Sequence, residues 1–417
     1  APRPKEPSLH PTLQNSPLGM EKWDPNRGMP IMVQAEAVHV IEEPFTSTGA
    51  WDGGQGEQTQ RHGEREAPIY GGQGGQGAPQ TYEGAPQAHS QTPLFNNEAG
   101  ARAFLSEHDI PLGLQDAFVS SMAKLPKRFF IVDDSGSMSI NDGNRLISAG
   151  PKSKMMQCSR WSELTDMVKF HVSLARQAGA PSEFRLLNSV HPIRLGYDYQ
   201  SEGDAFRTLT GILSGSPGGG TPLCRHIREV IEEVRGAEHA LRSRGQKVAL
   251  IIATDGQASD GSVAEAMRPL KNLPVLVILR LCTDQEEVVR YWAEIDQELE
   301  LHMDVLDDFA GEAREIHKVN PWLTYGVQMQ RLREFGVPVK EFDLLDERQM
   351  SFDEIHRVIW HIYGGSLSEY PHPGVDMKGL QAVVARKNQE TRPTWDPCTR
   401  KMQPWVNLKK GGGCVVC

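Results

Sequence analysis

The feature that most limits the possible folds is a series of short, very apolar segments that alternate with amphipathic ones. "RFFIV" at 128–132, "KVALIIAT" at 247–254 and "LPVLVILRL" at 273–281 are almost continuous runs of β-branched residues, Leu and Phe. Such runs are typical of strands that are buried on both faces of a sheet. Segments with helical spacing lie between them, including 160–179 and 221–245. Strands that alternate with helices predict an α/β fold, with a Rossmann-like, mostly parallel central sheet and helices on both faces.

The composition changes at both ends of the chain. Residues 49–88 contain eleven Gly and seven Gln in forty positions, and they lack Leu, Val, Met and Phe. A segment of this kind cannot bury enough apolar surface to offset its ordering entropy. We therefore predict a disordered N-terminal arm, one α/β domain from roughly 95 to 365, and a C-terminal tail.

Charge and cysteine usage exclude several classes of protein. Lys and Arg total 44 against 54 Asp and Glu, so the net charge is −10. A general nucleic-acid-binding protein carries a basic excess, and we expect no nucleic-acid partner. The six cysteines do not form a framework of close spacings, which favours a reducing compartment. Because the first residues lack an apolar signal core and no run approaches 18 apolar residues, we expect a cytoplasmic protein that does not span a membrane.

Three polar clusters fall where ligands bind in open α/β sheets, near the carboxyl ends of strands. Asp133, Ser135 and Ser137 follow "RFFIV", and their D-x-S-x-S spacing points all three the same way in an extended segment. Thr221 follows three glycines in "SPGGGTPL", and Asp255 follows "ALIIAT". Carboxylates and hydroxyls are hard oxygen donors, which suit Mg²⁺. Two aspartates neutralise a divalent ion, which then stays able to accept one more carboxylate from outside.

The order of these motifs resembles a known family. D-x-S-G-S, then a Gly-rich loop with T-P, then T-D-G is similar to the metal-ion-dependent adhesion site (MIDAS) of von Willebrand factor type A (VWFA) domains. The resemblance implies a domain that binds Mg²⁺ or Mn²⁺ through the five residues just named, with an exposed Asp or Glu of a partner protein as the last ligand. It divides the chain into a disordered arm at 1–94, a helical lead-in at 95–125, a VWFA domain at 126–310, helices packed on that domain at 311–365 and a basic tail at 366–417.

The sequence departs from the family pattern at one place. Residues 139–159, "SINDGNRLISAGPKSKMMQCS", separate the serines from the next helix, which follows them closely in the family. This insertion lies beside the predicted metal. Either it shapes the choice of partner or partly covers the ion, or it is a tolerated surface loop.

Catalytic motifs that use similar residues are incomplete here. The position two after Asp133 is Ser135, so the D-x-D pair of an aspartyl-phosphate phosphatase is absent. "GSPGGGT" lacks the Lys of a phosphate-binding loop, and no G-x-S-x-G elbow surrounds Ser137. We therefore expect an intracellular protein-interaction module and no enzyme. Two alternatives stay open: a scaffold subunit of a larger complex with a structural metal, and a metal-dependent hydrolase.

The last residues, "NLKKGGGCVVC", fit the C-a-a-X pattern of prenylation with Cys414 as the lipid acceptor. A single lipid needs a second signal to hold a membrane. From residue 378 onward eight basic residues face two acidic ones, and this +6 tail is suited to the anionic cytoplasmic face of a membrane, with Trp395 and Trp405 at the interface. The rival interpretations are a redox pair or palmitoylation, and a tail without function.

Overall fold

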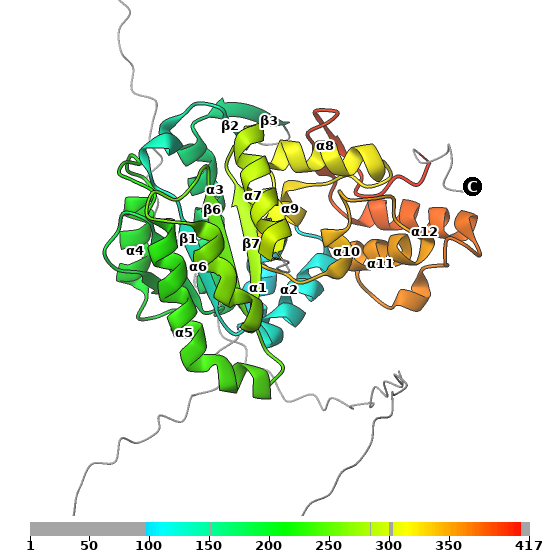
Figure 1. Ribbon diagram of the computed structural model, residues 1–417. Helices are drawn as coiled ribbons and strands as arrows, with labels where there is room; N and C mark the ends of the chain where they lie inside the picture. The colour runs from blue at the N-terminus through cyan, green and yellow to red at the C-terminus, as the bar shows by residue number, and fades with distance from the viewer. Residues whose placement is uncertain (1–96, 150–151, 284, 300–302, 410–417) are drawn as a thin grey trace, which may run out of the picture. The chain divides into compact units, whose positions relative to one another are not determined.

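The computed structural model describes residues 97–149, 152–283, 285–299 and 303–409. The predicted disordered arm therefore lies outside the described residues. The centre of the described part is a six-stranded sheet in the order β5-β4-β1-β6-β7-β8, in which all neighbouring pairs are parallel except β4 and β5 (Figure 1). Its strands are β1 (Arg128–Val132), β4 (Ser182–Leu186), β5 (Ile193–Leu195), β6 (Val248–Thr254), β7 (Val275–Leu281) and β8 (Met303–Leu306).

The central strands are buried on both faces, as their apolar runs predicted. In β1, Phe130 and Val132 enter one core, while Phe129 and Ile131 enter the other. All seven residues of β6 are buried as well. Because successive side chains of a strand point to opposite faces, a nearly continuous apolar run is what a strand needs when helices cover it on both sides.

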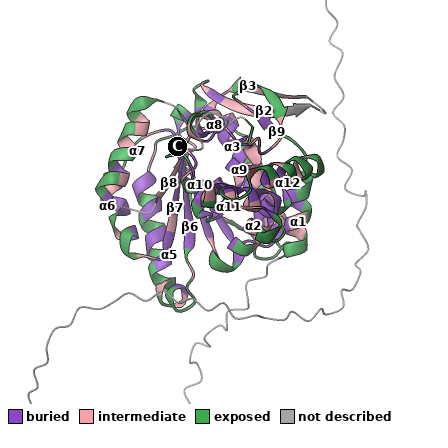
Figure 2. Ribbon diagram, turned by 90° about the vertical axis from the view of Figure 1, so that its right-hand side faces the viewer, coloured by how far each residue is buried: buried purple, intermediate pink, exposed green. Residues whose placement is uncertain are grey.

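Helices cover both faces of the sheet, which confirms the predicted α/β fold (Figures 1 and 2). The core that contains Phe129 and Ile131 is closed by α5 (Leu223–Ser243), α6 (Val263–Met267) and α7 (Glu286–Leu299). Among the described residues, those of nine further helices share the other core: α1 (Glu98–Glu107), α2 (Leu112–Lys124), α3 (Arg160–Ala178), α4 (Gly203–Ile212), α8 (Phe309–Val319), α9 (Val327–Glu334), α10 (Lys340–Asp343), α11 (Phe352–Tyr363) and α12 (Met377–Glu390).

Helix α3 begins and ends at residues that suit helix termini. The Ser159 side chain accepts a hydrogen bond from the Ser162 N–H and so caps the first turn. Gly179 follows the last turn with φ 58°, a left-handed conformation that glycine adopts without strain. Helix α3 therefore starts at a fixed point, and its first residue, Arg160, is important for the site described below.

The region from 366 onward is less of a tail than the sequence suggested. Residues 377–403 form helix α12 (Met377–Glu390) and a small antiparallel pair, β9 (Thr394–Asp396) and β10 (Lys401–Gln403). Trp405 is fully buried, and its indole N–H donates to the Arg392 carbonyl oxygen at 3.0 Å. Trp395 is buried too, so neither Trp is free to sit at a membrane interface.

The physical reason for this correction is the spacing of the apolar residues. Leu380, Val384, Trp405 and Val406 are buried in one core, but the segment between Val384 and Trp405 carries several basic residues, and the two pairs meet only after the helix and the hairpin have folded. The Trp405 carbonyl oxygen accepts from the Thr324 N–H, and the Asn407 N–H donates to Trp322. Within the described ranges, no helix combines the length and the apolar character that crossing a membrane requires.

Candidate metal centre

Strands β1 and β6 are neighbours in the sheet, and a proposed metal ligand follows each of them. The parallel register pairs Val132 with Ala253, so both strands end at the same edge. Asp133 comes directly after β1, and Asp255 directly after β6. Their side chains are almost fully buried, with 0% of Asp133 and 4% of Asp255 exposed. The sheet thus places the two predicted carboxylates at one carboxyl edge.

Hydrogen bonds connect four of the five predicted ligands. The Ser135 and Ser137 hydroxyl oxygens lie 3.0 Å apart, and the Ser137 hydroxyl donates to Asp255 Oδ1 at 2.9 Å. Asp133 Oδ1 accepts from the Ser135 N–H at 2.9 Å. Its Oδ2 accepts from the Thr254 hydroxyl at 2.6 Å. This row of oxygen atoms runs from one strand tip to the other, over a short 3₁₀ turn, η1 (Gly136–Ser139).

Burial makes the Asp133 carboxylate a group that favours a cation. Removal from water raises the pKa of Asp133, the hydrogen bonds from Thr254 and Ser135 lower it, and the nearby Asp255 raises it. A buried carboxylate with a raised pKa gains from any positive charge that binds beside it.

The fifth predicted ligand, Thr221, reaches the same edge through its backbone. Its N–H donates to the Ser259 hydroxyl at 3.1 Å, and its carbonyl oxygen accepts from the Ser259 N–H at 2.8 Å. The glycines before it touch the β1 loop, because the Gly218 N–H donates to the Asp134 carbonyl oxygen and Gly136 donates to the Gly219 carbonyl oxygen. Within the part that the structure describes, the Thr221 hydroxyl makes no hydrogen bond to the other four ligands. It is near the cluster without being part of its hydrogen-bond row.

The second aspartate of "VDDSGS" has a different role from the first. Asp134 Oδ1 accepts from both the backbone N–H and the side-chain amide of Asn188, at 2.9 and 2.8 Å. The Asn188 amide also donates to the Gly220 carbonyl oxygen at 3.0 Å. Asp134 therefore connects the loops that follow β1 and β4, and within the described ranges its side chain makes no hydrogen bond to the row of oxygen atoms.

Sequence reasoning missed one residue of this site, Arg160. Its side chain is 2% exposed, and Nη1 donates to Asp255 Oδ2 at 2.8 Å. Nε and Nη2 hold both oxygens of Asp142, at 2.7 and 2.5 Å. A basic residue in the first turn of a helix opposes the helix dipole. That conflict was the one available signal that Arg160 has acidic partners elsewhere in the chain.

The insertion at 139–159 folds into a β-hairpin whose base adjoins the site. Strands β2 (Gly143–Ala149) and β3 (Lys152–Cys158) pair antiparallel. Asp142 precedes β2 and binds Arg160, while the Asn144 N–H donates to Glu163 Oε2 at 2.8 Å. Two residues of the first turn of α3 thus hold the hairpin base. The insertion is linked to Asp255 through Arg160, and whether it shapes the choice of partner stays a prediction.

The residues at this edge fit a small divalent cation by their chemistry. Asp133, Ser135, Ser137, Thr221 and Asp255 offer oxygen atoms alone, which Mg²⁺ and Mn²⁺ prefer. Among the described residues, no group of three or more His, Cys, Asp or Glu is arranged to hold a metal ion. Any ion at this edge must therefore use the hydroxyls together with the two carboxylates. One oxygen of Asp255 already binds Arg160, which leaves Oδ1 beside Ser137 for the ion.

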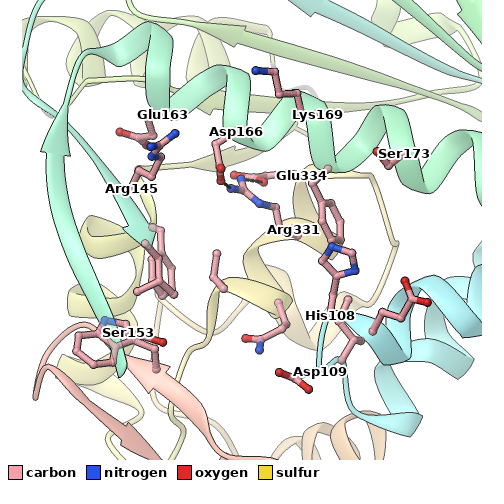
Figure 3. Close-up of a pocket in the computed structure, with 18 of the residues that line it drawn as sticks. His108, Asp109, Arg145, Ser153, Glu163, Asp166, Lys169, Ser173, Arg331 and Glu334 are labelled. Carbon is pink, nitrogen blue, oxygen red and sulfur yellow. Dashed lines mark hydrogen bonds and ion pairs between the residues drawn. The ribbon is translucent and has the colours of Figure 1, made fainter. Parts of the chain in front are cut away.

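A separate cavity of about 570 Å³ is lined by residues of the hairpin, among them Arg145 and Ser153, and by residues of α3 and α9 (Figure 3). Charged groups on its floor pair with one another: Arg331 lies beside Asp166 and Glu334, with separations of 2.8 and 3.0 Å. Glu334 also binds the buried Arg280 at 3.0 Å. None of the five predicted metal ligands lines this cavity. Five acidic and four basic residues line the cavity, so its charge does not indicate a class of ligand.

Comparisons with known proteins add little to this picture. Searches of protein-family models and of curated proteins found no match. Among solved structures, the chain is similar to the conserved hypothetical protein BatB from Bacteroides thetaiotaomicron, with 14% identity and a TM-score of 0.29. The match covers 50% of this chain and 96% of that one. A likeness at this level does not extend to the site or to its function.

Proposed function

We propose that this chain is a protein-interaction module that uses a divalent ion, Mg²⁺ or Mn²⁺, to bind an acidic residue of a partner. Asp133, Ser135, Ser137, Thr221 and Asp255 would hold the ion. The observation that carries the proposal is the hydrogen-bonded row from Ser135 through Ser137 to Asp255, which connects two strand tips that lie far apart in the sequence. The same motifs, in the same order, are those that resemble the VWFA metal site.

The exposure of the site supports docking from outside. Ser137 is exposed, while Asp133 and Asp255 are buried below it. An ion held there would be neutralised from the protein side and open on the other. Such an ion attracts a carboxylate, since the hydroxyl ligands add no charge. The bound metal would supply the electrophilic centre, and the residues around it would form the surface on which the partner docks.

Metal-dependent capture tests this proposal. The full chain is immobilised and offered a cell lysate in Mg²⁺ or in EDTA, and the captured proteins are identified by mass spectrometry. We expect partners that bind in Mg²⁺, leave in EDTA, and are lost with Ser137→Ala. Ser139→Ala is the matched control, because Ser139 is an exposed serine two residues further on in the same turn and outside the motif. The same set of partners in both buffers would contradict the proposal.

Two other functions make different predictions. A scaffold subunit with a structural ion would lose thermal stability in EDTA and keep its partners. A metal-dependent hydrolase would turn over a phosphate ester in Mg²⁺ and lose that activity with Ser135→Ala. No contact among the described residues specifically favours either of them.

Membrane attachment through Cys414 is a further part of the proposal. Cys414 lies outside the described residues. Supporting it are exposed basic residues near the last described position, among them Arg400, Lys401 and Lys409. An intact mass from a eukaryotic host tests it: a prenyl gain with loss of the last three residues is expected, and an unmodified Cys417 end would exclude it.

A further inference from the structure

A buried guanidinium lies at the edge of the proposed metal centre and is shared between two carboxylates. Arg160 is 2% exposed and binds Asp255 with one nitrogen and Asp142 with two. Asp142 is more accessible, with a third of its side chain exposed. The Arg160 backbone N–H also donates to the Ile140 carbonyl oxygen at 3.0 Å, so both the backbone and the side chain of this residue meet the insertion.

Arg160 contributes a permanent positive charge at this acidic edge. Asp133, Asp142 and Asp255 carry three negative charges, and Arg160 offsets one of them. The two charges left over match those of a divalent ion. Arginine stays protonated in proteins, so its charge is a constant feature of the site. An unpaired charge would be costly at the depth of Arg160, and its pairs with Asp142 and Asp255 remove that cost.

We propose that Arg160 is a positioning residue whose bond to Asp142 sets how tightly the neighbouring centre binds a divalent ion. Arg160 holds Oδ2 of Asp255 and thereby turns Oδ1 toward Ser137. Its charge repels the ion, while Asp142 draws that charge toward the hairpin. The inference rests on the proposed function, because it concerns the same metal centre.

The placement of Asp142 also connects the hairpin to the ion. Asp142 immediately precedes β2, and the exposed apolar residues Ile140 and Met156, each 45% exposed, lie on the same insertion. A partner that moves the hairpin would shift Asp142 and so change how strongly Arg160 binds Asp255. If the partner changes the Mg²⁺ affinity in this way, linkage requires that Mg²⁺ change the affinity for the partner by the same factor. Movement of the insertion would thus change the Mg²⁺ affinity of the site.

Opposite effects of two single substitutions test this inference. Mg²⁺ affinity is measured by titration calorimetry on the full-length parent, Asp142→Asn, Arg160→Gln and the double variant. Asp142→Asn removes a negative charge and should weaken Mg²⁺ binding by about tenfold or more. Arg160→Gln removes the repelling cation and should tighten binding by a similar factor. The double variant restores the charge of the parent and should return close to its affinity.

Each outcome decides the question. If the two single variants both weaken binding and the double variant is worse than either, Arg160 and Asp142 merely support the fold, and the inference fails while the proposed function stands. If the parent itself binds no Mg²⁺, both fail. Arg160→Lys keeps the charge but loses the two-pronged bond to Asp142, so Asp142 draws the cation away from the ion less well and Mg²⁺ should bind more weakly than in the parent. Should Arg160→Gln not fold, Asp142→Asn still decides, because an unchanged affinity in that variant overturns the inference.

Discussion

At the scale of single residues, two adjacent aspartates that follow β1 have different partners. Asp133 accepts hydrogen bonds from the Ser135 N–H and from the hydroxyl of Thr254, the last residue of the neighbouring strand β6. Asp134 points elsewhere and binds Asn188. The D-x-S-x-S spacing assumed an extended segment, but β1 ends at Val132 and Ser137 lies in the 3₁₀ turn η1, so the turn and not period-two alternation brings Ser137 beside Ser135.

Asp133→Asn should abolish the effect of Mg²⁺ without unfolding the protein. An Asn can accept from the Ser135 N–H and approach the Thr254 hydroxyl with its amide, so the neutral side chain fits the same pocket. Because burial raises the pKa of Asp133, the uncharged Asn costs no more to bury than the carboxylate. In a thermal-unfolding assay, Mg²⁺ should raise the unfolding temperature of the parent and leave the variant unchanged. An equal shift in both proteins would remove Asp133 from the metal centre.

Asp134→Ala should lower the stability of the protein and leave its response to Mg²⁺ unchanged. Two hydrogen bonds to Asn188 are lost, and the free energy of unfolding should fall by roughly 1–3 kcal/mol. The gain in unfolding temperature from Mg²⁺ should remain. Urea denaturation with and without Mg²⁺ measures both effects. A variant that keeps its stability but no longer responds to Mg²⁺ would show that Asp134, and not Asp133, binds the metal.

At the scale of elements, the sequence predicted those whose pattern is local and missed those that depend on distant contacts. The apolar runs at β1, β6 and β7 identify strands without further information. The insertion forms a hairpin in which Leu146 pairs with Met155 across β2 and β3. No alternating pattern of apolar and polar residues in the sequence predicted this pairing. Arg160 was missed for a similar reason, since its partners Asp142 and Asp255 lie 18 and 95 residues away.

The folded C-terminal region gives a prediction at this scale. Trp405 is fully buried, and Trp→Ala changes in a core typically cost about 3–5 kcal/mol. Trp405→Ala should therefore lower the free energy of unfolding by that amount. Met402→Ala is the matched control, because Met402 is 42% exposed in the neighbouring strand β10 and should change stability little. If both variants unfold like the parent in chemical denaturation, the region is a loosely attached tail after all.

At the scale of the whole molecule, the sequence determined the fold class and the convergence of three motifs. Buried parallel strands force their carboxyl ends to one edge, so Asp133 and Asp255 had to meet. The sequence could not show that the Thr221 backbone bonds to Ser259 while, among the described residues, its hydroxyl makes no hydrogen bond to the other four predicted ligands, because side-chain direction in a Gly-rich loop depends on how the loop packs. It also could not show the end of the folded region, because apolar residues of α12 and β10 are dispersed among basic ones.

The stability of the molecule should depend on pH through partly buried acids after β8. Burial and the nearby Glu315 and Asp308 raise the pKa of Asp307 to about 6. A raised value in the folded state contributes stability at low pH that is lost as pH rises through about 6. Buried His171, whose pKa burial lowers, acts in the opposite direction, so the parent alone does not separate the two.

The difference between Asp307→Asn and the parent isolates the contribution of that carboxyl. At pH 8 the variant should be more stable by on the order of 1–3 kcal/mol, because it buries no charge at this position. At pH 4, where the parent carboxyl is largely protonated, the two should be alike. Urea unfolding at both values measures this, and a variant that is less stable than the parent at pH 8 would show that the ionised Asp307 is well paired.

The proposed function depends on a metal ion at the carboxyl edge of β1 and β6. Titration calorimetry of MgCl₂ into the full chain, with Asp133→Asn as the comparison, tests it most directly. We predict one Mg²⁺ bound per chain in the parent and none in the variant. A parent that binds no Mg²⁺ or Mn²⁺, or a variant that binds as well as the parent, would contradict the account.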